Sequence, residues 1–471
     1  MSSTASSLPP EPRGRPTRRA RLVAFDDDQP PDPELLSDCV HCGFCLPACP
    51  TYQLWGEEMD SPRGRILLMD LAAKGERPLS AEMTAHFDSC LGCLACVPAC
   101  PSGVRYDLLL ESTRQQVERR FRRPLGERVW RRALLGTLPH PTLLRLGALA
   151  LWGAGRISPR APGALPGRLG AAGRLLPSTP DPRTLVRRLP APRRPAGRAR
   201  MRVGLLGGCV QRVTFPGVNE ATAIALATAG AEVRVPPGQG CCGALEFHAG
   251  RREAALRRAR RLVEVFDDPQ LDRIAVNSAG CGALVKEVGR LLESDPRLGP
   301  AAQRVAAKAR DVSEILVELG PPAHLGALPL RVAYHDACHL SQAQGVRSAP
   351  RRVLEWIPEL QLLELAEPEI CCGSAGTYNL TAPAAAADLG RRKAETVLRV
   401  APQVLAAGNP GCLLQLRSAL DQLGSDLPLL HPVELLAASM LGLDPGSALR
   451  STPAGFHPPP PGRYPPGPPA A

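Results

Sequence analysis

Residues 39–50 read CVHCGFCLPACP and residues 90–101 read CLGCLACVPACP, so one cysteine pattern occurs twice near the start of the chain. Each copy has the spacing C-x2-C-x2-C-x3-C and ends on a proline directly after the last cysteine. The cysteines concerned are Cys39, Cys42, Cys45, Cys49, Cys90, Cys93, Cys96 and Cys100. Thiols this dense, in a chain with no recognisable secretion signal, indicate metal or redox chemistry rather than disulfide bonds.

This spacing is typical of bacterial ferredoxins, in which three cysteines bind one [4Fe–4S] cluster and the fourth reaches the other cluster. We therefore expect a first cluster on Cys39, Cys42, Cys45 and Cys100, and a second on Cys90, Cys93, Cys96 and Cys49. Zinc also binds paired cysteines, but two complete runs that each end on proline favour iron–sulfur. The 40 residues between the two runs predict a helical form of this module.

The other eight cysteines form two groups with a shared pattern: a single cysteine, a CysCysGly unit and a later single cysteine. The first group is Cys209, Cys241, Cys242 and Cys281, and the second is Cys338, Cys371, Cys372 and Cys412. Equivalent cysteines are offset by 129 to 131 residues, so residues 201–320 and 330–445 are predicted to be an internal duplication.

Strand-like apolar runs alternate with helical patterns in both halves of the duplication. The predicted strands are 202–206, 232–235, 273–277, 330–334, 360–365 and 403–406. Such alternation predicts parallel strands joined by helices, and the cysteines follow the strands, where an open α/β sheet binds its ligands. The predicted fold is therefore α+β and multidomain: a helical two-cluster ferredoxin domain followed by a duplicated α/β cysteine-rich (CCG) domain with parallel strands.

The chemistry of the CysCysGly groups has several interpretations. Adjacent cysteines diverge, which suits different irons of a cluster, so a further cluster is expected in one or both halves. The alternatives are a mononuclear zinc site, a redox-active pair of adjacent thiols, or a vestigial element of the fold. His335, Asp336 and His339 flank Cys338, and we expect them to hydrogen-bond to a metal ligand rather than to bind metal.

A dinucleotide motif is present in one half only. Gly238, Gly240 and Gly243 fit G-x-G-x-x-G. The second half keeps the cysteines but retains only the last of these glycines, as Gly373. We therefore expect neither flavin nor NAD on this chain.

The composition of the chain is a weaker guide to its function than the cysteine motifs. The net charge is +12, but only four of the 57 basic residues are lysine, and Gly and Pro are abundant, which is typical of GC-rich genomes. No nucleic-acid partner is expected.

The chain has no apolar run long enough to cross a membrane. We therefore expect a cytoplasmic protein, and the alternative is peripheral attachment to the inner face of the cell membrane. Trp130 and Arg131, with Leu135 and Trp152, either form a surface for anionic lipid or cover the ferredoxin domain.

The expected organisation has six parts. These are a disordered Arg/Pro-rich tail (1–33), the 4Fe–4S domain (34–115), a basic helical segment with a Pro/Arg linker (116–200), two CCG domains (201–320 and 330–445) and a disordered Pro-rich tail (446–471).

Together these motifs resemble the iron–sulfur subunit of bacterial glycolate oxidase. The resemblance is carried by CVHCGFCLPACPTY (39–52), SPRGRILLM (61–69), CLGCLACVPACPSGVRY (90–106), the CCG units, NSAGCGALVKEVG (277–289), GNPGCLLQL (408–416) and HPVELL (431–436). It implies an electron-transfer subunit, without catalytic residues of its own, in a complex that oxidises glycolate to glyoxylate. An FAD-binding partner subunit would hold the substrate, and electrons would pass to quinone or another membrane acceptor.

Related systems share parts of this pattern. The resemblance leaves two alternatives. One is the iron–sulfur subunit of a glycerol-3-phosphate or lactate dehydrogenase, and the other is a heterodisulfide-reductase-like thiol–disulfide enzyme. The fuller CCG sites of heterodisulfide reductases have a further cysteine three residues after the last one of each group. Leu284 and Gln415 stand at those positions here.

Overall fold

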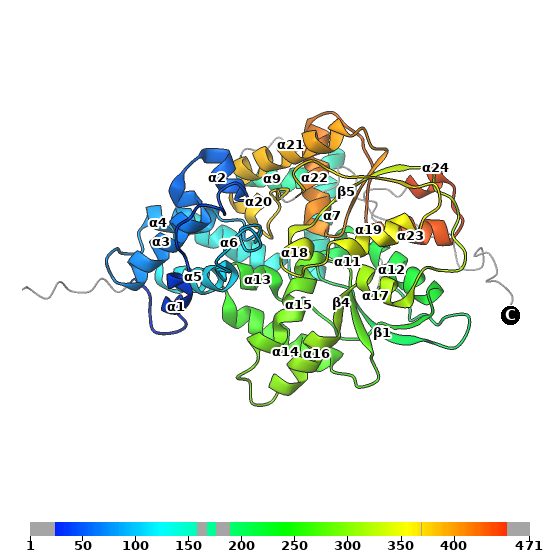
Figure 1. The fold of residues 1–471 in the computed structure, drawn as a ribbon, viewed down its shortest axis with the longest axis horizontal. Coiled ribbons are helices and arrows are strands. Elements are labelled where there is room, and N and C mark those ends of the chain that lie inside the picture. The colour runs from blue at the N-terminus through cyan, green and yellow to red at the C-terminus, as the bar shows by residue number, and fades with distance from the viewer. Residues whose placement is uncertain (1–23, 158–166, 176–188, 369, 450–471) are drawn as a thin grey trace, which may run out of the picture.

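The computed structural model describes residues 24–157, 167–175, 189–368 and 370–449. The chain begins with a helical module, drawn in blue at one end of the molecule (Figure 1). Its elements are α1 (Pro33–Ser37), α2 (Pro50–Trp55), the 3₁₀ helix η1 (Glu58–Asp60), α3 (Pro62–Ala73), α4 (Ala81–Ser89) and α5 (Tyr106–Arg120). Ser61 and Ser80 cap α3 and α4 by accepting hydrogen bonds from backbone N–H groups.

The core of this module contains cysteines as well as apolar residues. Met69, Phe87 and Leu109 are fully buried, and Cys90 and Cys96 belong to the same cluster of buried side chains. Part of the predicted N-terminal tail joins this core, because Ala24 and Phe25 are buried there. A Pro- and Arg-rich composition had concealed this short apolar pair; the rest of the predicted tail lies outside the described residues.

Three helices connect this module to the rest of the chain: α6 (Leu125–Thr137), α7 (Pro141–Ile157) and α9 (Gly167–Leu175). Trp130 of α6 donates a hydrogen bond to the carbonyl of Leu380 at 2.9 Å, Arg131 pairs with Asp88, and Leu135 is buried. These side chains face the protein, which agrees with a covering helix; the side chain of Trp152 is outside the described part. Helix α9 lies within the predicted linker and contacts α20 and α22.

Two parallel sheets follow, as the sequence predicted, each with four strands where three were expected (Figure 1). The strands of the first half are β1 (Met201–Leu206), β2 (Ala231–Arg234), β3 (Arg273–Val276) and β4 (Ala309–Asp311), in the order β2-β1-β3-β4. Those of the second half are β5 (Arg331–His335), β6 (Gln361–Leu363), β7 (Val404–Ala407) and β8 (Leu429–Leu430), in the order β6-β5-β7-β8. The two sheets thus repeat one topology, and the helical domain followed by a duplicated α/β domain is confirmed.

Helices surround both sheets. The first half has α11 (Gln211–Thr214), α12 (Pro216–Thr228), α13 (Ala244–His248), α14 (Arg252–Phe266), α15 (Ala279–Leu291), α16 (Gly299–Lys308) and α17 (Val312–Leu319). The second has α18 (Cys338–Ser341), α19 (Ser348–Glu355), α20 (Tyr378–Thr381), α21 (Pro383–Arg399), α22 (Pro410–Gln422), α23 (Pro432–Met440) and α24 (Pro445–Leu449). Helices α12 and α23 contact each other, and one hydrophobic core extends through both halves.

No helix among the described residues is both long and apolar enough to cross a membrane.

Candidate metal centres

The first predicted ligand set comes together at the surface of the helical module. Cys39, Cys42, Cys45 and Cys100 line one cavity, with Ile66 and Tyr106 among its other walls. Burial raises the pKa of the thiols of Cys39 and Cys45. The four thiols therefore come from two distant parts of the chain, as the crossed ferredoxin pattern requires.

The second predicted set lies deeper. Cys49, Cys90, Cys93 and Cys96 are all buried. Burial raises the pKa of the Cys93 and Cys96 thiols. The nearby thiols of Cys49 and Cys90 raise these two pKa values further, because like charges repel. Two donors face the Cys90 sulfur: the backbone N–H of Gly92 at 3.4 Å and the hydroxyl of Tyr106 at 3.5 Å.

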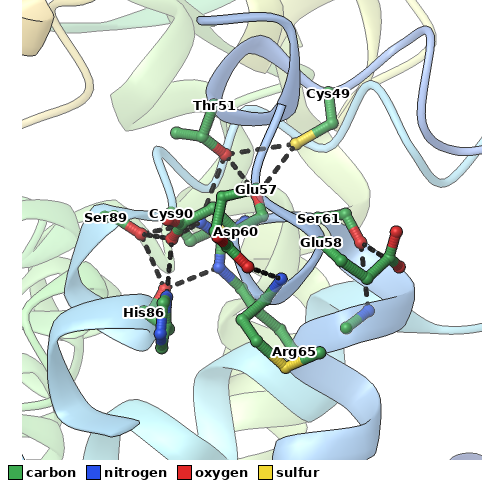
Figure 2. Close-up of polar contacts among 12 residues, drawn as sticks. Cys49, Thr51, Glu57, Glu58, Asp60, Ser61, Arg65, His86, Ser89 and Cys90 are labelled. Atoms are coloured by element: carbon green, nitrogen blue, oxygen red, sulfur yellow. Dashed lines mark hydrogen bonds and ion pairs between the residues drawn. The ribbon is translucent and has the colours of Figure 1, made fainter. Parts of the chain in front are cut away.

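A buried arginine joins the two cysteine runs (Figure 2). The side chain of Arg65 in α3 is only 1% exposed. It donates hydrogen bonds to the carboxylate of Asp60 (3.1 Å), the carbonyl of His86 (2.6 Å), and the hydroxyls of Thr51 (3.1 Å) and Ser89 (2.7 Å). The Thr51 hydroxyl lies 3.2 Å from the Cys49 sulfur. Burial opposes ionisation of Cys90, but Arg65 and Arg114 outweigh burial and lower the pKa of its thiol.

These surroundings fit iron–sulfur clusters chemically. Thiolates are the ligands that such clusters require, and N–H or O–H donors to sulfur and nearby cations stabilise the electron-rich cluster. Arg65 supplies the cation, and Gly92 and Tyr106 supply donors. The sequence indicated the candidate ligands but no role for Arg65, because nothing in the spacing reveals which arginine is buried.

The four cysteines of the first half converge at the carboxyl edge of its sheet. Cys209 follows β1, the pair Cys241–Cys242 follows β2, and Cys281 lies in the first turn of α15 after β3. The sulfurs of Cys209 and Cys241 are 3.3 Å apart, and Cys242 hydrogen-bonds to Cys281. The hydrogen bond from Cys209 lowers the pKa of Cys241 to about 3. The group lies where β1 has neighbours on both sides, the usual ligand position of such sheets.

The second half repeats this arrangement. Cys338 contacts Cys371, Cys371 contacts Cys372, and Cys372 contacts Cys412, so the four thiols form a continuous chain. Cys412 lies in the first turn of α22, and its sulfur accepts a hydrogen bond from the Asn409 side chain at 3.4 Å. The predicted convergence is therefore present in both halves.

The glycines of the CysCysGly units have a packing role. Gly243 and Gly373 have φ values of +98° and +86°. A Cβ atom would lie 3.0 Å from the carbonyl oxygen of Ala255 at Gly243, and 2.7 Å from that of Ala386 at Gly373. Glycine is thus required for the close approach of α14 and α21, which explains Gly243 without a bound nucleotide.

The helical module touches the second cysteine group directly. Cys93 lies in one cluster of buried side chains with Cys371 and Tyr378, and Cys338 packs against that cluster. This cluster contains no cysteine of the first half. The second half is therefore the one whose thiols adjoin a predicted ferredoxin ligand.

The polar residues around Cys338 have different partners. Asp336 forms an ion pair with Arg351 through both carboxylate oxygens, at 2.9 and 2.6 Å. His339 lies 3.5 Å from the Cys338 sulfur and 3.2 Å from His248. His335 faces the other end of the thiol chain, where its ring is grouped with Cys372 and Cys412. Only His339 is thus placed as a hydrogen-bonding neighbour of a thiol.

Comparison with known proteins accounts for all four cysteine groups. Residues 35–104 match the 4Fe-4S dicluster domain, and residues 203–286 and 332–417 match the cysteine-rich (CCG) domain. The chain is 36% identical over 393 residues to the glycolate oxidase iron-sulfur subunit of Escherichia coli (strain K12), covering 82% of this chain and 90% of that one. It is 35% identical over 404 residues to the probable glycolate oxidase iron-sulfur subunit of Bacillus subtilis (strain 168), covering 83% and 90%. This chain belongs to the family of glycolate oxidase iron–sulfur subunits.

The match to the 4Fe-4S dicluster domain supports two [4Fe–4S] clusters in the helical module. More partial similarity extends to lactate utilization protein A of Exiguobacterium sp., at 28% identity over 50% of this chain and 96% of that one. A crystal structure of a hypothetical protein from Helicobacter pylori has a TM-score of 0.51 at 9% identity, over 81% of this chain and 68% of that chain, and shares only the fold.

Proposed function

We propose that this chain is the electron-transfer subunit of a complex that oxidises glycolate to glyoxylate. It would receive electrons from an FAD-binding subunit and pass them toward quinone or another membrane acceptor. The family and the two four-cysteine groups of the helical module support this role. The observation that carries it is the burial of Cys93 against Cys371, which brings a ferredoxin ligand to a second cysteine group.

The ligand assignment follows the crossed pattern. Cys39, Cys42, Cys45 and Cys100 would hold one [4Fe–4S] cluster, and Cys90, Cys93, Cys96 and Cys49 the other. Each cluster supplies a one-electron carrier when bound. Arg65 holds the two cysteine runs together and places a positive charge beside Cys49 and Cys90, which stabilises their thiolates. A further metal centre in one or both CCG halves is part of the same proposal.

We also place the complex at the inner face of the membrane, because a quinone acceptor is membrane-bound. Leu125 and Val129 on α6 are 73% and 59% exposed, and Leu146 on α7 is 58% exposed. Arg128 and Arg132 are exposed on α6 as well. Apolar side chains beside basic ones suit an anionic lipid surface or the membrane-facing side of a partner.

The test uses the complex of this chain with its flavoprotein subunit. Cys93→Ser should abolish glycolate-dependent quinone reduction while the flavoprotein still reduces an artificial dye directly, because only the onward path is broken. The dye assay is the internal control for flavoprotein folding and glycolate binding. Quinone reduction at the normal rate by the flavoprotein alone would contradict the proposal.

A second substrate class has a specific observation in its favour. Lactate utilization protein A matches half of this chain, and a fumarate reductase (CoM/CoB) chain of Methanothermobacter marburgensis is 33% identical over 239 residues, which are 50% of this chain and 46% of that one. Lactate, glycerol 3-phosphate and a thiol–disulfide couple should therefore be compared with glycolate in the same assay. The glycolate proposal requires glycolate to give the highest kcat/KM.

A further inference from the structure

One histidine of the second half is buried without a hydrogen-bond partner. His335 ends the central strand β5, is 1% exposed, and neither ring nitrogen has a partner. An unpaired buried polar group is destabilising, and such groups are rare in folded proteins unless a ligand or water satisfies them.

The ring is aimed at two thiols. One ring nitrogen of His335 and the sulfurs of Cys372 and Cys412 all lie within 4.8 Å of one another. Ligand atoms around one tetrahedral zinc ion, at ~2.0–2.3 Å from the metal, are separated from each other by roughly 3.3–3.8 Å. The three atoms are therefore at most about 1.5 Å farther apart than a single metal would hold them.

The first half lacks this feature although it has the same four cysteines. Leu206 stands three residues before Cys209, where the second half has His335 before Cys338. Val263 stands twenty-one residues after Cys242, where the second half has Lys393 after Cys372. The second half thus has an imidazole and a cation at positions that are apolar in the first half.

Two further polar side chains near these thiols suit thiolates. Lys393 is 1% exposed, donates to the Glu367 carbonyl at 2.6 Å, and is close enough to Cys371 and Cys372 to interact with their charge. Asn409 donates to the sulfur of Cys412. A buried cation and an amide donor both favour the deprotonated thiols that metal binding requires.

We infer that the second CCG half binds a thiophilic transition metal through the imidazole of His335 and the thiolates of Cys372 and Cys412, and that the first half has no equivalent mixed site. Imidazole with thiolate ligands suits zinc, or an iron of a cluster. This assignment replaces the expectation that His335 only hydrogen-bonds to a ligand. It also leaves Cys371 and Cys338, at the other end of the thiol chain, beside Cys93 of the ferredoxin module.

The test is the metal content of the full chain, purified anaerobically, in variants of one residue. His335→Leu installs the residue that the first half has and should lose one zinc per chain, or the iron in excess of the two ferredoxin clusters. Cys412→Ser should lose the same metal. His335→Cys offers a thiolate in place of the imidazole and should retain it. The EPR signals of the ferredoxin clusters report on folding in every variant.

The matched control is His431→Asn. His431 is a buried histidine of the same half that caps α23 and lies outside the three-atom group. This variant should keep the metal. Zinc lost from His335→Leu would identify a single ion, and iron lost together with sulfide would identify a cluster; either result supports the site.

Metal content unchanged in His335→Leu would overturn the inference, as would equal loss from His431→Asn, which would indicate general unfolding. The measurement needs no glycolate, quinone or flavoprotein. Its failure is therefore distinguishable from failure of the proposed electron-transfer role.

Discussion

Arg65 is the side chain on which the helical module depends most. Its guanidinium is buried with Asp60, whose side chain is 12% exposed, and four acceptors surround it. Removing one partner of a buried ion pair leaves the other charge uncompensated and typically costs about 3–5 kcal/mol. Arg65→Leu should therefore release the visible iron–sulfur absorbance at a much lower urea concentration than in the wild type.

Lys74 provides the control for this variant. It directly follows the same helix, α3, and pairs with Asp70 at 2.6 Å, but the two side chains are 58% and 31% exposed. Such exposed pairs contribute little to stability. Lys74→Leu should leave the urea midpoint almost unchanged, and equal losses in the two variants would contradict the role assigned to Arg65.

Asp311 predicts an unusual pH dependence. It caps α17, accepts a hydrogen bond from the Ser313 N–H at 2.9 Å, and is buried, which raises its pKa from 3.8 to about 6. Because the folded pKa is raised, the contribution of this carboxyl group to stability is fully present below pH 3.8 and is lost as the pH rises from there through about 6. Asp311→Asn keeps a cap acceptor without the buried charge.

This variant should raise the unfolding temperature above pH 6, with a gain of up to about 3 kcal/mol that shrinks toward pH 3.8. Thermal unfolding followed by circular dichroism at a series of pH values measures it. A gain that is the same at every pH would show that the buried charge is not the cause.

The grouping of the cysteines could be predicted because their spacing is itself the signal, whereas the residues that surround them could not. Arg65 and His335 are informative only through burial and partners, and those arise from packing between segments distant in sequence. Asp336 and His339 illustrate the same limit. Each is adjacent to the cysteine group in the chain, yet only His339 contacts a thiol in space.

Among the secondary-structure elements, the turn after each cysteine pair has a strict requirement for glycine. Gly243→Ala and Gly373→Ala place a side chain in the left-handed region, at about 1–2 kcal/mol, and push a methyl group against the backbone of α14 or α21. Each should lower the unfolding temperature. Gly240→Ala should be nearly neutral, because its added Cβ meets nothing within 4 Å.

Equal destabilisation by Gly240→Ala would instead indicate that the whole glycine-rich stretch is constrained, as a nucleotide site would require. Six of the eight strands and their parallel arrangement were predictable, because each of the six lies in an apolar run and these runs alternate with helical patterns. Strands β4 and β8 were not predicted, because β4 has three residues of which only Ala309 is apolar, and β8 has two residues. Helix α9 was concealed by the Gly- and Arg-rich composition of its segment.

At the scale of the whole molecule, the helical module packs closely against the first half, where α5 contacts α13. Gly250, after α13, has a φ of +80°, and a Cβ atom there would overlap the backbone oxygen of Arg114 in α5. Gly250→Ala should therefore separate α5 from α13 and increase hydrogen exchange of the α5 amides. Gly345→Ala is the matched control, since its φ is +69° but its Cβ would be unobstructed.

Unaltered exchange in α5 in Gly250→Ala would mean that the docking is looser than the structure indicates. No sequence pattern predicted this contact or that of Cys93 with Cys371. Both depend on how separately patterned domains pack together, which the periodicity of neither domain encodes. In the sequence, the apolar side chains at these contacts cannot be distinguished from core residues of their own segments.

Iron, acid-labile sulfide and reduced-state EPR, measured on the anaerobically purified full chain, test the electron-transfer account most directly. Two clusters in the helical module predict at least about eight irons with matching sulfide per chain, and two interacting [4Fe–4S] signals that glycolate elicits in the presence of the flavoprotein. Zinc without sulfide in the helical module would contradict the account, because that metal carries no electrons.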